Sequence, residues 1–87
     1  DEAEKALNDM RSLLKSSLIS VETLLRESKN ALDLNIIDDL TDLKDSLVDA
    51  QTLQDMNILE QLALSAQETI QLAQNQVYRK ADEYIQS

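Results

Sequence analysis

The sequence contains no glycine, proline, cysteine, histidine, tryptophan or phenylalanine. Glycine and proline mark most turns and hairpins, so their absence, together with the lack of strand-like runs, argues against a β fold. Without cysteine the chain can form neither a disulfide nor a cysteine-based metal site. Histidine, the commonest general base, and the cysteine thiol nucleophile are both missing. These absences favour an all-helical protein that is not an enzyme and holds no cofactor.

Two further absences bear on partners. No apolar run approaches the roughly 18 residues of a membrane span, so we expect no membrane insertion. Positive charge is scarce, with 8 lysines and arginines against 17 aspartates and glutamates and a net charge of −9. Nucleic acids are polyanions and would repel such a chain, so we expect no nucleic-acid binding. A protein partner with a basic surface is compatible with this charge, but acidity also simply promotes solubility. The lack of cysteine suits every redox compartment and therefore indicates no localisation.

Apolar residues make up 43% of the chain, which is enough for a packed core in one small domain spanning residues 1–87. The spacing predicts a first helix over about 2–32, because apolar or small residues recur at alternating steps of three and four. That stripe consists of Ala3, Leu7, Met10, Leu14, Ser17, Val21, Leu24, Ser28 and Ala31. Leu18, Leu25 and Leu32 widen it by one row, as a bundle helix requires.

A shorter central helix is predicted over about 36–53, with Asn35 as its N-cap. Its apolar stripe is Ile36, Ile37, Leu40, Leu43 and Leu47. The spacing Asn57-x-x-Glu60 resembles a capping box and predicts a third helix over about 57–85. The third stripe is Leu59, Leu62, Ala66, Ile70, Ala73, Val77, Ala81 and Tyr84.

Three such stripes joined by short turns predict an all-α, antiparallel, up-down-up three-helix bundle. At 1.5 Å per residue the outer helices would each be about 45 Å long and the central helix roughly 25 to 30 Å. The start of the first helix and the end of the third would then lack complete apolar cover. Fraying, a longer central helix or a second chain would resolve this mismatch, and the last of these predicts self-association or a docked partner.

The central helix carries an unusual density of carboxylates. Residues 33–55 contain seven aspartates and one lysine, which gives this segment a net charge of −6. The aspartates Asp38, Asp42, Asp45 and Asp49 recur at steps of four, three and four and share one face. This face is interpreted either as solvated surface or as a docking face for a basic protein. A metal site is not expected, since the segment lacks the glycine and the terminal glutamate of a calcium loop.

The third helix offers two further candidates. Leu64 and Leu72 lie off its main stripe, and its neutral polar face holds Gln61, Gln67, Gln71, Gln74, Asn75 and Gln76. These leucines are interpreted as a widening of the core face, with a buried partner surface as the alternative. Near the end of the chain, two aromatic and two cationic residues form a candidate contact patch, because tyrosine and arginine are favoured at interfaces. The patch consists of Tyr78, Arg79, Lys80 and Tyr84.

No family motif is present. In general layout the chain resembles three-helix interaction modules such as spectrin-like and vesicle-tethering bundles, but it lacks the tryptophan typical of a spectrin repeat. The leading hypothesis is a non-enzymatic protein-interaction or assembly module that binds through helix faces. The alternative is a small helical carrier that holds an apolar ligand between its helices, with Met10 and Met56 as adaptable lining. A structural spacer within a larger protein is a third interpretation.

Overall fold

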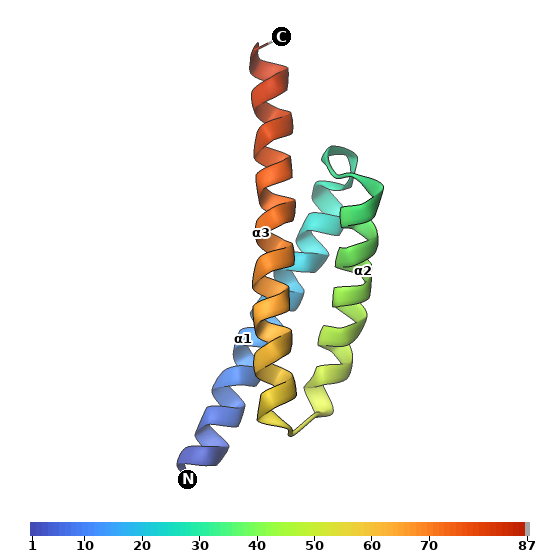
Figure 1. Cartoon of the computed structure of the whole chain (residues 1–87). Coiled ribbons are helices and arrows are strands. Elements are labelled where there is room, and N and C mark those ends of the chain that lie inside the picture. The colour runs from blue at the N-terminus through green and yellow to red at the C-terminus, as the bar shows by residue number, and fades with distance from the viewer. Residues whose placement is uncertain (87) are drawn as a thin grey trace.

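The computed structural model describes residues 1–86 and shows three helices packed side by side (Figure 1). Helix α1 spans Glu2–Glu27, α2 spans Leu34–Asp49 and α3 spans Met56–Gln86. Short 3₁₀ turns at Lys29–Ala31 and Ala50–Thr52 lie in the two connections. The chain runs up, down and up again, which confirms the predicted all-α three-helix bundle.

The prediction that the first helix continues to Leu32 is wrong. The helix ends at Glu27, because Ser28 leaves helical geometry (φ −121°, ψ 11°) while its N–H still bonds to the carbonyl of Leu24. Leu32 adopts an extended conformation and is nevertheless buried, with 8% of its surface exposed. The three–four spacing thus continues past the end of the helix.

The predicted caps of the other two helices are also wrong. Asp33, with extended backbone, precedes α2, and its carbonyl accepts a hydrogen bond from the Ile37 N–H (3.0 Å); Asn35 lies inside the helix. At the start of α3, Asp55 Oδ1 accepts from the backbone N–H groups of Asn57 (3.0 Å) and Ile58 (3.4 Å). An aspartate that accepts these N–H groups acts as the N-cap, so α3 begins one residue before the predicted start. Helix α2 ends at Asp49 and the 3₁₀ turn takes its place over 50–52, short of the predicted end at 53.

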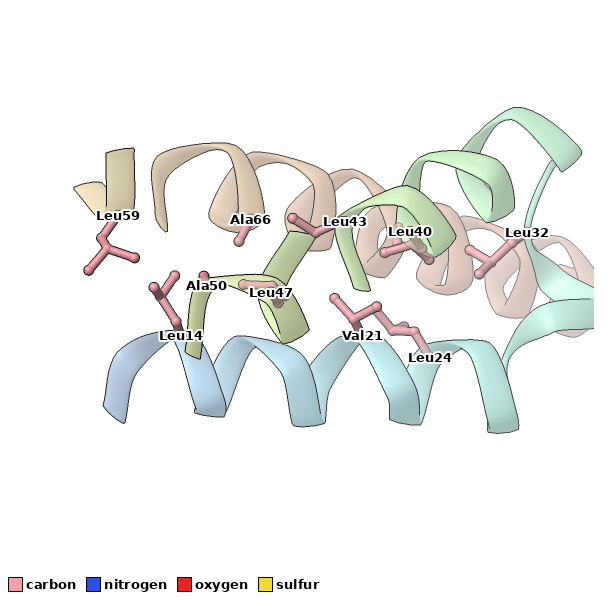
Figure 2. Packing of buried hydrophobic residues seen from close by; sticks show 11 residues of the cluster. Leu14, Val21, Leu24, Leu32, Leu40, Leu43, Leu47, Ala50, Leu59 and Ala66 are labelled. Carbon is pink, nitrogen blue, oxygen red and sulfur yellow. The ribbon is translucent and has the colours of Figure 1, made fainter. Parts of the chain in front are cut away.

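The core is aliphatic and draws on all three helices, as the stripes predict. Figure 2 shows its buried side chains pointing towards one another from α1, α2 and α3. The fully buried members are Leu14, Val21, Leu40, Leu47, Ala50, Leu59, Ala66 and Ala73. Helix α3 contributes two alanines to this set, and such small side chains let its backbone approach its neighbours closely.

The two longer helices extend beyond the bundle at opposite ends, as the predicted lengths require. Helix α1 projects at the N-terminus and α3 at the C-terminus, and the molecule measures 56 × 20 × 18 Å (Figure 1). Residues 1–6 and residues 78–86 are all exposed. Because α2 has only 16 residues, it covers only the middle of its neighbours.

Polar contacts fix the points at which the long helices leave the bundle. Gln76 Oε1 accepts from the Asp33 N–H (2.6 Å), and Gln76 Nε2 donates to Asp33 Oδ2 (2.7 Å). At the other end, Arg11 Nη2 donates to the carbonyl of Leu53 (2.9 Å). Each contact ties one long helix to the turn that it passes, so the uncovered ends begin at defined residues.

Candidate partner-binding surfaces

The four aspartates of the predicted docking face lie on the outer side of α2. Asp38, Asp42, Asp45 and Asp49 are all exposed. In the part of the chain that the structure describes, the ion pairs join the N-terminal amine to Glu4 and Arg26 to Glu27, so neither involves these aspartates. Within residues 1–86 no group of three or more carboxylates is arranged to hold a metal ion. The aspartates form an open, uncompensated negative face.

The C-terminal end of this aspartate face lowers the stability of α2. Asp49 is the last residue of the helix, and the last turn contains no basic residue. A carboxylate at the C-terminal end of a helix opposes the helix dipole, and like charges spaced four apart repel each other.

We therefore expect Asp49→Asn to raise the free energy of unfolding by a few tenths of a kcal/mol, measured by urea denaturation at low salt. Asp38→Asn is the matched control, because Asp38 lies in the second turn of the same helix, far from its C-terminal end. The gain at Asp49 should shrink as salt screens the dipole. A loss of stability in Asp49→Asn would contradict this account of the face.

The candidate patch at the end of α3 is also exposed but lies apart from the aspartates. Tyr78 retains 73% and Tyr84 retains 84% of their surfaces. Arg79 and Lys80 line a small hollow with Gln76 and the turn that follows α1. The patch lies on the projecting end of α3, whereas the aspartates follow the length of α2 (Figure 1). The predicted site residues therefore form two separate surfaces.

A third surface is an open groove between α1 and α3 with a volume of about 650 Å³. Helix α1 lines it with Met10, Leu13, Ser16, Ser17 and Ser20. Helix α3 lines it with Glu60, Ala63, Leu64, Gln67, Ile70, Gln71 and Gln74. Glu60 is the one charged residue among these, although charged residues make up 29% of the chain. The groove is thus a nearly neutral strip on a strongly acidic molecule.

The interpretation of Leu64 and Leu72 as a widened core face is wrong. Leu64 is 62% exposed and lies in the groove, while Leu72 is 58% exposed and lies outside it. Both point away from the core because, at about 100° of rotation per residue, Leu64 lies about 160° and Leu72 about 120° around the helix from the fully buried Ala66. The sequence indicated the neutral glutamines and Leu64 of α3 as a candidate surface. It did not identify the residues of α1 that line the other side of the groove.

Comparison with protein-family models, with curated proteins and with solved structures found no match to this chain. No helix within residues 1–86 has the length and apolarity needed to cross a membrane. The surfaces themselves are therefore the basis for a functional proposal.

Proposed function

We propose that the chain is a non-enzymatic protein-interaction module that binds an amphipathic helix of a basic partner in the groove between α1 and α3. The observation that carries this proposal is the neutral, leucine-edged groove on a protein with net charge −9. Charged residues are depleted in the buried centres of protein interfaces, and exposed leucines gain most from burial there.

The dimensions of the groove suit a helix. Its residues on α3 run from Glu60 to Gln74, which corresponds to about four helical turns, or roughly 21 Å. Serines and Ala63 line much of its length, and small side chains allow two helices to approach within about 8–10 Å. Leu13 and Leu64, at 52% and 62% exposure, provide apolar contacts for the incoming helix.

Charge defines the class of partner. The aspartate face and the overall negative charge attract a basic protein at long range and so raise its rate of encounter. The groove then supplies the short-range apolar contact. This arrangement corresponds to recognition of a helix in a groove, in which the partner presents anchors at helical spacing.

The experiment uses a designed peptide of about four turns, long enough to span the groove, with leucine and alanine on one face and lysine on the other. We expect it to shift the methyl NMR signals of Leu13, Leu64 and Ala63, and Leu64→Glu to weaken its binding about tenfold or more. Leu72→Glu is the matched control, since Leu72 is an equally exposed leucine of α3 outside the groove. Equal losses in the two variants, or shifts confined to α2, would refute binding in the groove.

The volume of the groove also favours a second candidate, a carrier of a small apolar ligand. About 650 Å³ lies within the usual range of ligand pockets, roughly 300–1,000 Å³. An uncharged apolar fluorophore distinguishes the two. Saturable one-to-one binding that Leu64→Glu abolishes, without any response to the peptide, would support the carrier.

A further inference from the structure

The groove side of α3 follows a second helical repeat, separate from the stripe that packs into the core. Starting at Glu60, alternating steps of four and three reach Leu64, Gln67, Gln71 and Gln74, and all five residues line the groove. We call this row the outer seam. A spacing that averages 3.5 residues keeps one row of side chains facing a neighbouring helix along its whole length. The repeat therefore favours a helix as the occupant of the groove over a compact small molecule.

The outer seam continues beyond the groove to the end of α3. The same steps lead from Gln74 to Tyr78, Ala81 and Ile85 without a slip. Four of the nine residues in 78–86 are charged, yet none of these four stands on the seam. Beyond its first residue the outer seam is thus uncharged, and depletion of charge is typical of the buried centre of a protein interface.

The end of the outer seam lies on the same side of α3 as the groove. At about 100° of rotation per residue, the groove residues of α3 lie about 40–160° around the helix from the fully buried Ala66. Tyr78, Ala81 and Ile85 lie at about 120°, 60° and 100°, which is within that arc. All three are exposed, Tyr78 by 73% and Ile85 by 78%. A helix that leaves the groove along α3 therefore meets these three side chains next.

The turn that follows α1 does not cover this part of the seam. The hollow beside that turn is lined from α3 by Gln76, Arg79, Lys80 and Glu83. These four residues lie about 220–320° around the helix from Ala66, on the opposite side from the seam. Helix α3 projects past the rest of the bundle here (Figure 1), so a partner helix can continue along it without displacing the turn.

We propose that the partner helix extends past the groove along the outer seam to Ile85, and so spans about seven turns instead of four. This inference rests on the proposed function and adds the length and contact pattern of the partner. The distance along α3 from Glu60 to Ile85 is about 38 Å. Tyr78 and Ile85 supply apolar anchors, and the small side chain of Ala81 between them allows close approach of the partner. The partner presents uncharged side chains at the same spacing and keeps its basic residues on the outer face.

The test compares the designed four-turn peptide with a seven-turn peptide that repeats the same pattern of leucine, alanine and lysine. The uniform repeat offers the same anchors in either direction of binding. We expect the seven-turn peptide to bind the full chain about tenfold or more tightly than the four-turn peptide, because it buries two further large side chains. It should shift the methyl NMR signals of Ala81 and Ile85 together with that of Leu64, whereas the four-turn peptide should shift Leu64 and leave Ile85 unchanged.

The variant Ile85→Glu separates the apolar contact from the extra positive charge of the longer peptide. We expect it to weaken the seven-turn peptide about tenfold, although the new carboxylate attracts lysine, and to leave the four-turn peptide unaffected. Gln86→Glu is the matched control, since Gln86 is exposed in the same turn but lies off the seam. With this variant the seven-turn peptide should keep its full advantage.

The outcomes separate the length of the partner from the existence of the groove site. If the four-turn peptide binds in the groove but the longer peptide gains no affinity and leaves Ile85 unchanged, this inference fails and the proposed function stands. If neither peptide shifts Leu64, both fail. Equal binding of the seven-turn peptide to Ile85→Glu and Gln86→Glu would overturn the inference too, because its gain would then come from charge and not from the seam.

Discussion

Leu14→Ala is expected to lower the free energy of unfolding by about 3 kcal/mol. Leu14 is fully buried, and it points from α1 into the space shared with the other two helices (Figure 2). Removing its methyl groups loses their transfer free energy and leaves a cavity, which together cost about 2–5 kcal/mol in a rigid core. A domain of 87 residues has a total stability of only about 4–13 kcal/mol, so the loss is a large fraction. Urea denaturation and the melting temperature, expected to fall by about 12 °C or more, measure it.

The preceding residue supplies the matched control. Leu13 is 52% exposed and lines the groove, so Leu13→Ala removes the same atoms from the surface. We expect it to change stability by less than about 0.5 kcal/mol while weakening the binding of the designed peptide. If the two variants lost equal stability, the core-facing side of α1 would have been assigned incorrectly.

Leu13 and Leu14 also show what the sequence could predict. The three–four stripe includes Leu14 and omits Leu13, and the structure buries the first and exposes the second. Periodicity identifies the buried side of a helix because burial and helical rotation repeat together. It does not identify where a helix ends. Leu32 continues the stripe from outside the helix, since a residue in an extended turn can still reach the core.

The candidate surfaces were predictable only in part. The aspartate face follows from helical spacing alone, because the aspartates all belong to one helix. The groove depends on two helices that are distant in the sequence, and no local pattern shows that Ser17 and Ala63 line the same groove. Leu64 was assigned to the core although it lies about 160° around the helix from Ala66, the fully buried residue two positions on. Two neighbouring helices do not cover so wide an arc, and Leu64 stays exposed.

Periodicity also does not show how far along α3 the apolar stripe is buried. A pair of alanine substitutions tests where that burial ends. Ala66 and Ala81 belong to one predicted stripe, yet Ala66 is fully buried and Ala81 is exposed beyond the end of the bundle. Ala66→Asp would place an unpaired carboxylate between three aliphatic helices. An uncompensated buried charge costs about 3–5 kcal/mol, so we expect most of the variant to be unfolded or close to it at room temperature.

Ala81→Asp makes the same chemical change on the same stripe of the same helix, and we expect its unfolding free energy to stay within about 0.5 kcal/mol of the original. Circular dichroism during urea denaturation measures both variants, at a concentration low enough to keep the chains separate. An Ala66→Asp protein with an unchanged unfolding midpoint would show that α3 does not pack where the structure places it. A large loss in Ala81→Asp at the same dilution would instead mean that the end of α3 is covered within a single chain. The stripe would then be core along its whole length.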